Sequence, residues 1–268
     1  MQVSLGTCAI CGSAMSELFR ARVLHRHEVR YLQCARCEFL CTEPPYWLAE
    51  AYSSAIASAD TGLVMRNLQI ARKLSCVLAE FFDHSGRYLD FAGGTGLLTR
   101  LMRDTGFDFR WEDAYCANQM AVGFEAAAGE VGFEVATAFE AIEHMPDPMA
   151  FVSDLLGRTS SRSLIFTTEL FSAPRPAADW WYYSFPTGQH ISFFSTRTMA
   201  EIAQRCGVKF YSDGYLHMLS AADISEWKYR RVLKKADRGL FEKWAARLHS
   251  RTQDDHQEML RRSGQPSR

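Results

Sequence analysis

Apolar and polar positions follow two different periods along the chain, and these periods predict which segments are helices and which are strands. Across residues 46–82 apolar residues recur at helical spacing. Four later segments are short, apolar and bounded by turns, which is typical of buried strands: 87–92, 107–111, 133–139 and 163–168. Because helical or turn segments separate these strands, we expect a doubly wound, Rossmann-like α/β sheet with helices on both faces.

The same pattern divides the chain into three regions. Pro44 and Pro45 mark a turn, because proline restricts its own backbone and that of the residue before it. We therefore expect a cysteine-rich module at 1–45, the α/β domain at 46–222 and a charged helical tail at 223–268. No chemistry is assigned to the tail.

Composition narrows the classes of partner. The 268 residues are 47% hydrophobic and 23% charged, which is enough apolar material for one sizeable core. Lys and Arg number 30 against 31 Asp and Glu, so a net charge of -1 disfavours nucleic acid as a partner. No apolar run approaches membrane-spanning length and the first residues lack a secretory signal, so we expect a cytoplasmic protein without a membrane partner. The pattern does not specify an oligomeric state.

Four of the eight cysteines form two Cys-x-x-Cys pairs, Cys8 with Cys11 and Cys34 with Cys37. In a reducing compartment such pairs favour metal ligation over disulfides, and four thiolates suit a structural Zn²⁺. An iron–sulfur site or free thiols are the alternatives. A module this short buries little core, so the metal would contribute most of its folding energy. Substitute ligands are offered by Cys41, His25 and His27, but we interpret Cys41 as a small buried apolar group and the two histidines as surface residues.

A glycine-rich turn at 90–96 follows the first predicted strand and opens a helix. Glycines let the backbone pass close to a nucleotide-like ligand. Nineteen residues after Gly94, Asp113 ends the second strand, where a carboxylate can accept hydrogen bonds from ribose hydroxyls. The turn and this carboxylate together predict a site for a cofactor that contains adenosine.

Two cofactor classes fit this turn poorly. A nicotinamide fingerprint requires Gly-x-Gly-x-x-Gly, but after Gly94 and Gly96 the third position is Thr99. A phosphate-binding loop requires a Gly-Lys-Ser or Gly-Lys-Thr ending, which this sequence lacks. The pattern therefore disfavours a dehydrogenase and a nucleotide triphosphatase.

The turn instead resembles the first motif of class I S-adenosylmethionine-dependent methyltransferases, with Ala92 where that motif usually has its first glycine. The segment 138–148 resembles the family's Glu-x-x-Glu-His-x-x-Asp-Pro segment, and 123–125 resembles a shortened third strand with Phe124 facing the adenine. The resemblance implies S-adenosylmethionine as cofactor, with Asp90 toward its methionine end. The residues it places on the cofactor side are Asp90, Ala92, Gly93, Gly94, Thr95, Gly96, Asp113, Phe124, Phe139, Glu140 and His144. A core or helix-capping role is the alternative for His144.

An aromatic segment at 179–195 follows the fourth strand, on the substrate side of such a fold. Aromatic faces stack on sugar rings or on a sulfonium, and an imidazole accepts a proton near neutral pH. We assign Trp181, Tyr183 and Gln189 to the substrate and His190 to the general base, with Glu169 as a second catalytic candidate. Packing in a lid or interface is the alternative for the aromatic residues, and helix capping for Glu169.

The whole arrangement resembles bacterial sugar-modifying and surface-polysaccharide methyltransferases with an N-terminal zinc module. It implies methyl transfer to a sugar or a nucleotide-linked sugar. Gln189 stands where the sugar C-methyltransferases have a glutamate before the base histidine, so carbon, oxygen and nitrogen remain open as the acceptor atom. The alternatives are an RNA or protein methyltransferase that uses the module as a reader, and a zinc-ribbon binding protein without catalysis.

Overall fold

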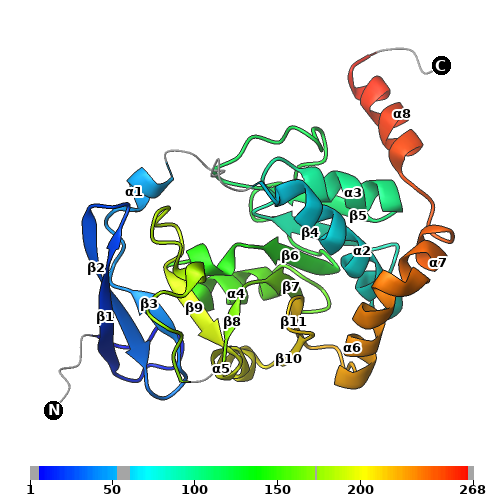
Figure 1. The fold of residues 1–268 in the computed structure, drawn as a ribbon. Helices are drawn as coiled ribbons and strands as arrows, with labels where there is room; N and C mark the ends of the chain where they lie inside the picture. Colours follow the sequence, from blue (N-terminus) through cyan, green and yellow to red (C-terminus); the bar gives the residue numbers. More distant parts are fainter. Residues whose placement is uncertain (1–5, 53–60, 173, 265–268) are drawn as a thin grey trace.

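The computed structural model describes residues 6–52, 61–172 and 174–264. Its strands form two sheets, one of six strands in the order β10-β11-β7-β6-β4-β5 and one of five in the order β1-β2-β3-β9-β8. Figure 1 shows the N-terminal strands beside the larger sheet, with the C-terminal helix α8 (Thr252–Arg262) projecting from the opposite end. The larger sheet forms the core of the α/β domain.

Four parallel strands form the centre of the larger sheet: β4 (Arg87–Phe91), β5 (Asp108–Glu112), β6 (Val135–Phe139) and β7 (Ser163–Thr167). They confirm the four strands predicted from the sequence. Two antiparallel strands, β11 (His217–Ser220) and β10 (Lys209–Ser212), extend the sheet beyond β7. The chain places β5 on one side of β4 and β6 on the other, which creates the switch point at which α/β sheets bind ligands.

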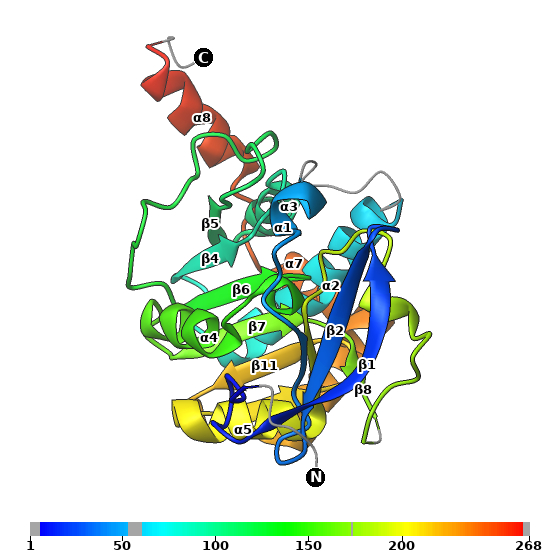
Figure 2. The same ribbon diagram turned by 90° about the vertical axis from the view of Figure 1, so that its left-hand side faces the viewer.

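Helices cover both faces of this sheet, as Figures 1 and 2 show. The helices α4 (Pro148–Gly157) and α5 (Thr196–Cys206) pack on one face, and α2 (Leu63–Phe81), α3 (Leu97–Thr105) and α6 (Glu226–Lys235) on the other. Successive strand residues point to opposite faces, so in β7 Leu164 and Phe166 join the first layer and Ile165 the second. Although α6 belongs to the predicted tail, it fills the same layer as α2 and α3.

Local capping determines where two of these helices begin. Before α4, the Asp147 side chain accepts a hydrogen bond from the Ala150 amide at 2.9 Å, and Pro148 occupies the first turn. Before α5, Ser195 and Thr198 form a reciprocal capping box. The capping side chains of Asp147 and Ser195 therefore determine where the two helices begin.

The smaller sheet combines two parts of the chain. Its first three strands, β1 (Met15–Val23), β2 (His27–Cys34) and β3 (Leu40–Thr42), come from the predicted module, whereas β8 (Leu170–Phe171) and β9 (Ser192–Ser195) follow β7. The strand β3 pairs antiparallel with β9, with Leu40 opposite Phe193. The division at residue 45 stays a prediction, but the sheet itself continues across it.

Short elements complete the fold. They are α1 (Leu48–Ala51), the 3₁₀ turns η1 (Ile142–His144) and η2 (Trp181–Tyr183), the π-turn η3 (Ala236–Leu240) and α7 (Phe241–Ala245). Within the described residues, every helix is too short or too polar to cross a lipid bilayer.

Candidate cofactor and acceptor site

The glycine turn after β4 is tied to the end of β5. The Gly94 amide donates to Asp113 Oδ2 at 2.9 Å, and the Gly93 amide donates to the Glu112 carbonyl at 3.2 Å. The Trp111 indole N–H donates to the Gly94 carbonyl at 2.9 Å. The carboxylate that was predicted to bind ribose therefore also holds the turn that was predicted to approach the cofactor.

Two non-glycine residues adopt left-handed backbone at this switch point. Ala92 follows β4 with a φ of 55°, and Glu140 follows β6 with a φ of 51°. Such a conformation costs a residue with a side chain about 1–2 kcal/mol, and strain of this kind clusters at functional sites. Because Ala92 adopts the backbone region that glycine favours, it can occupy the position where the family motif usually has glycine.

A pocket opens between the turn, the end of β6 and helix α2. Residues predicted for the cofactor that line it are Asp90, Ala92, Gly93, Gly94, Thr95, Phe139 and Glu140. Helix α2 adds residues that sequence reasoning missed, namely Leu63, Arg66, Asn67 and Ile70. Gly96 closes the end of the turn with a φ of 83°, and a Cβ there would lie 2.5 Å from Asn118 Oδ1. The turn therefore requires glycine at this position for both its backbone and its packing.

Asp90 is buried below this turn. Its Oδ2 accepts a hydrogen bond from the Thr99 hydroxyl at 2.7 Å, and its Oδ1 accepts one from Thr137 at 3.3 Å. Burial raises the pKa of the Asp90 carboxyl to about 6, although both hydroxyls act in the opposite direction. A positively charged ligand in the pocket would favour the ionised carboxylate.

The structure does not bring Phe124 or Tyr183 to this site. The Phe124 ring is buried, and its centroid lies 3.8 Å from the guanidinium carbon of Arg103, so it packs against charge rather than facing the pocket. The Tyr183 side chain is fully buried between Tyr31 and Phe193, with ring centroids 5.3 and 5.0 Å away. For Tyr183 the packing alternative holds.

Two histidines and a glutamate converge beside the pocket, although 45 residues separate the two histidines in sequence. One ligand-capable atom from each of Glu143, His144 and His190 lies within 4.8 Å of the others. The Nδ1 of His190 lies 2.7 Å from the Tyr182 carbonyl oxygen, and the Nδ1 of His144 lies 3.0 Å from the Gln189 carbonyl oxygen. In a neutral imidazole the nitrogen that faces a carbonyl carries the proton, so both lone pairs are at Nε2.

The electrostatics of this cluster follow from its burial. Burial and the neighbouring His144 lower the pKa of His190 to about 3, and burial also lowers the pKa of His144. Burial, with Glu140 nearby, raises the pKa of Glu143 to about 8. Glu143 Oε1 accepts a hydrogen bond from the Tyr182 hydroxyl at 2.8 Å. Sequence reasoning missed Glu143 and Tyr182, although Glu143 directly precedes His144 in the quoted motif.

Comparison with known proteins identifies the family. The sequence family described as "Methyltransferase domain" matches residues 65–212, which is more than half of the chain. The chain belongs to the methyltransferase domain family. Family membership places a methyltransferase domain in this chain, and the glycine turn of that domain resembles the family's S-adenosylmethionine motif.

Solved structures with a similar fold are also methyltransferases. They include TnmH (14% identity, TM-score 0.46, 66% of this chain and 62% of that one) and CalO1 of calicheamicin biosynthesis with S-adenosylhomocysteine bound (11%, 0.43, 65% and 61%). A third is magnesium protoporphyrin IX methyltransferase from Synechocystis PCC 6803 (12%, 0.42, 65% and 94%). The chain thus spans less than two thirds of the length of the first two. No curated protein matches it.

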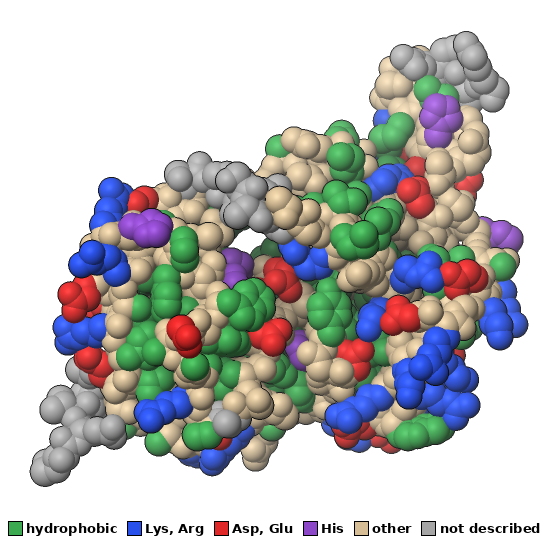
Figure 3. Space-filling model, viewed as in Figure 1, with side chains coloured by type: hydrophobic (Ala, Val, Ile, Leu, Met, Phe, Trp, Pro, Cys, Tyr) green, Lys and Arg blue, Asp and Glu red, His purple; other side chains and the backbone are tan. Residues whose placement is uncertain are grey.

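In this methyltransferase domain, the predicted acceptor residues have different surroundings. The Trp181 side chain is 73% exposed, whereas the Gln189 amide nitrogen donates to the Ala51 carbonyl at 2.9 Å and ties α1 to the segment. Glu169 follows β7 and is exposed; partial burial and Glu140 raise its pKa. Figure 3 shows histidine and acidic side chains at a hollow near the middle of this face.

A stacked pair of tyrosines lines a small pocket beside His144. Tyr52 and Tyr115 have ring centroids 5.1 Å apart, and both line a small pocket together with His144. Sequence reasoning missed this pair, because only the fold brings α1 next to the loop after β5. The pair provides an aromatic wall beside the histidines.

The four predicted metal ligands are brought together. Cys8 Sγ lies 3.5 Å from Cys37 Sγ, and Cys11 Sγ lies 3.4 Å from Cys34 Sγ. All four side chains are buried, and hydrogen bonding to Cys37 lowers the pKa of Cys8 to about 5. A tetrahedral zinc site with bonds of about 2.3 Å requires sulfur atoms about 3.7 Å apart, so the donor set fits Zn²⁺.

Helix α5 of the methyltransferase domain binds both cysteine turns. The Arg205 guanidinium donates to the Cys11 carbonyl at 2.9 Å, and the Thr198 hydroxyl donates to the Cys37 carbonyl at 2.9 Å. Since α5 directly follows β9, the cysteine cluster is connected to the segment that carries His190.

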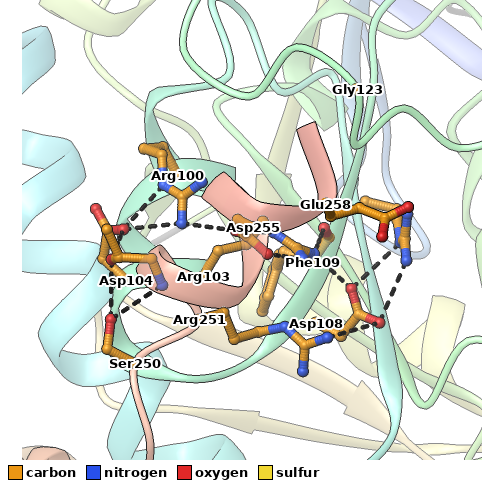
Figure 4. Close-up of polar contacts among 12 residues, drawn as sticks. Arg100, Arg103, Asp104, Asp108, Phe109, Gly123, Ser250, Arg251, Asp255 and Glu258 are labelled. Carbon is orange, nitrogen blue, oxygen red and sulfur yellow. Dashed lines mark hydrogen bonds and ion pairs between the residues drawn. The ribbon is translucent and has the colours of Figure 1, made fainter. Parts of the chain in front are cut away.

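The C-terminal helix α8 is bonded to α3 and to the loop after β5. Arg103 donates to both carboxylate oxygens of Asp255, at 2.8 and 2.6 Å, and also pairs with Asp108 (Figure 4). Near the end of α8, Arg262 donates to the Gly123 carbonyl at 2.7 Å. The tail thus fixes the loop that runs from Asp113 to Gly123.

Proposed function

We propose that this chain transfers the methyl group of S-adenosylmethionine to a small-molecule acceptor, a sugar or a nucleotide-linked sugar. The observation that carries this proposal is the position of the glycine turn, with Asp113, at the switch point next to the half-buried histidines. The sulfonium already activates its methyl group, so the protein has to hold a nucleophile in line with it. The hollow beside the pocket is the proposed acceptor site.

In this proposal the two carboxylates bind opposite ends of the cofactor. Asp113 accepts hydrogen bonds from the ribose hydroxyls, and Asp90 attracts the positively charged methionine portion. Gly94 supports close approach, because an added Cβ there meets no atom within 4 Å and points into open space. Cofactor binding therefore depends on the turn and on β5 together.

Two groups are proposed for the proton of the acceptor. His190 offers a lone pair at Nε2, but a pKa of about 3 makes it a weak base, because general bases work best with a pKa near the working pH. Glu169 has a raised pKa and lies closer to solvent. The exposed Trp181 provides a face on which a sugar ring can stack, which supports the sugar class.

We also propose that Cys8, Cys11, Cys34 and Cys37 hold a structural Zn²⁺. When bound, the ion would supply folding energy and no chemistry at the methyl group. The contacts of α5 with both cysteine turns support a positioning role for it, because they lead from the cluster to His190.

Isothermal calorimetry with S-adenosylmethionine and S-adenosylhomocysteine tests the cofactor site. We expect micromolar binding that is lost in Asp113→Ala and kept in Asp154→Ala, an exposed aspartate on α4. Absence of binding by the wild-type protein would contradict the enzymatic proposal.

Methyl transfer from labelled cofactor to a set of nucleotide-linked sugars tests the acceptor class. His190→Ala and Glu169→Gln should keep cofactor binding and lower turnover at least tenfold, because both act on the acceptor. Unchanged turnover in one variant removes that residue from the mechanism, and methylation of RNA or protein instead of sugars contradicts the acceptor class.

A further inference from the structure

We propose that Glu143, His144 and His190 form a binding site for one divalent transition-metal ion, distinct from the cysteine cluster. We further propose that the acceptor binds this ion through two neighbouring oxygen atoms. The inference rests on the proposed function, because it names how the acceptor is held in the hollow beside the cofactor pocket. The cysteine cluster lies in the N-terminal module, so the two sites are separate.

The donor set has the composition of known metal sites. Two imidazole nitrogens and one carboxylate oxygen bind Zn²⁺ in hydrolases and Fe²⁺ in oxygenases, in each case with positions left open for substrate or water. Ligand atoms at about 2.1 Å from one ion lie about 3–4 Å apart. The three donors lie within 4.8 Å of one another, so small side-chain rotations bring them to an ion.

The hydrogen bonds of both histidines prepare them as ligands. The Nδ1–H groups of His190 and His144 donate to the carbonyls of Tyr182 and Gln189, at 2.7 and 3.0 Å. Metal-binding histidines almost always donate their second ring N–H in this way, which fixes the tautomer and the ring orientation. The backbone therefore fixes the orientation of each ring.

The glutamate has an oxygen that no group in the described residues satisfies. The Glu143 side chain is fully buried; Oε1 binds the Tyr182 hydroxyl, but Oε2 is buried without a hydrogen-bond partner among those residues. Leaving such an oxygen unpaired costs about 1–3 kcal/mol or more. Glu140 adds negative charge nearby, since it raises the pKa of Glu143. A cation would satisfy Oε2 and compensate this charge.

The open positions of the ion determine the class of acceptor. Three protein ligands leave one position in tetrahedral and three in octahedral coordination. His144 lines the small pocket that Tyr52 and Tyr115 also line, so a ligand can reach the ion from there. Two adjacent oxygens, such as the vicinal hydroxyls of a sugar, fit this arrangement. With the ion bound, the lone pair of His190 is a ligand, and Glu169 takes the role of proton acceptor.

Co²⁺ is the probe for this site, added to the full-length protein with its cysteine cluster filled with zinc. We expect one Co²⁺ per chain, with a visible absorption band but no thiolate charge-transfer band, because no sulfur is a ligand. Glu143→Gln and His190→Ala should each weaken Co²⁺ binding at least tenfold. His256→Ala, which removes an exposed histidine on α8, should leave it unchanged.

Cofactor binding by the same variants shows that they are folded. Absence of Co²⁺ beyond the cysteine cluster, or equal binding in wild type and both variants, overturns the proposal. If the protein bound no Co²⁺ and methylated an amine, the carboxylates would instead bind a cationic acceptor. That result would also overturn the proposed metal site. Co²⁺ binding without S-adenosylmethionine binding would support the metal site and contradict the proposed function, so the two failures are distinguishable.

Discussion

At the residue scale, the turn after β4 combines a strained backbone with a buried charge. Ala92 occupies left-handed backbone at a φ of 55°, and the Asp90 carboxyl is buried two residues before it. Neither feature is needed to form the strand, which the apolar pattern already specifies. Both are typical of a site where the backbone is held in place for a ligand.

Ala92→Gly should stabilise the protein. Glycine adopts the left-handed region without the penalty for a Cβ atom, so we expect the free energy of unfolding to rise by about 0.5–1 kcal/mol. Urea denaturation followed by circular dichroism measures it. Ala200→Gly, at an exposed position inside α5, is the matched control and should lower stability by about 1 kcal/mol. A loss of stability at both positions would contradict the assigned strain.

The Asp90 carboxyl should make cofactor affinity depend on pH. The ionised form attracts the positive charges of S-adenosylmethionine, and a pKa of about 6 means that acidification protonates it. At about pH 5 only about a tenth of the carboxyls are ionised, so the Kd should be about tenfold higher than at about pH 8. Calorimetry at both values measures the change. Asp90→Asn should bind weakly without this dependence, and an equal dependence in both proteins would contradict the assignment.

At the element scale, helix α8 is attached to the methyltransferase domain by charge rather than by an apolar face. Arg103 on α3 and Asp255 on α8 are both buried, and they form a bidentate pair. The Phe124 ring stacks on the same guanidinium group. Phe124, which the family resemblance places against the adenine, therefore helps to attach the tail instead.

Asp255→Ala should be strongly destabilising. It leaves the guanidinium of Arg103 buried with only Asp108 as a charged partner, and breaking a buried pair costs about 3–5 kcal/mol. We expect this loss in urea denaturation, together with weaker cofactor binding because the loop from Asp113 is released. Asp254→Ala, at the exposed neighbouring position, is the control and should change stability by less than about 0.5 kcal/mol. Equal stability of the two variants would show that α8 is attached differently.

At the scale of the whole molecule, the smaller sheet connects the cysteine cluster with the proposed acceptor site. The strand β3 pairs with β9, and His190 lies two residues before β9. A structural change at the cysteine cluster therefore reaches His190 through strand β9 and helix α5. The cofactor pocket is built from other elements, namely β4, β6, α2 and α3.

Loss of the metal at the cysteine cluster should impair methyl transfer more than cofactor binding. Cys37→Ser removes one ligand, and we expect a lower zinc content, a lower melting temperature and at least a tenfold loss of turnover, with the Kd for S-adenosylmethionine changed less than threefold. Elemental analysis, calorimetry and the transfer assay measure these. Cys206→Ser, which lies outside the cluster, is the control. An equal loss of cofactor binding would contradict the separation of the two parts.

Much of the fold was predictable because its signals are local. Each central strand is a short apolar segment between turns, the glycine turn needs residues without a Cβ, and two Cys-x-x-Cys turns each present two sulfur atoms. These features depend on neighbours within a few residues, so the sequence by itself determined the parallel sheet, the glycine turn that lines the pocket and the grouping of Cys8, Cys11, Cys34 and Cys37.

Only the tertiary structure decided which distant residues meet and which aromatic rings are buried. Glu143 gains its significance from His190, which reaches it only after the chain has added β7, β8 and η2. Tyr183 and Trp181 are close in sequence, yet one is fully buried and the other exposed. The pairing of β3 with β9 sets these positions. It joins segments about 150 residues apart, so no local sequence pattern encodes it.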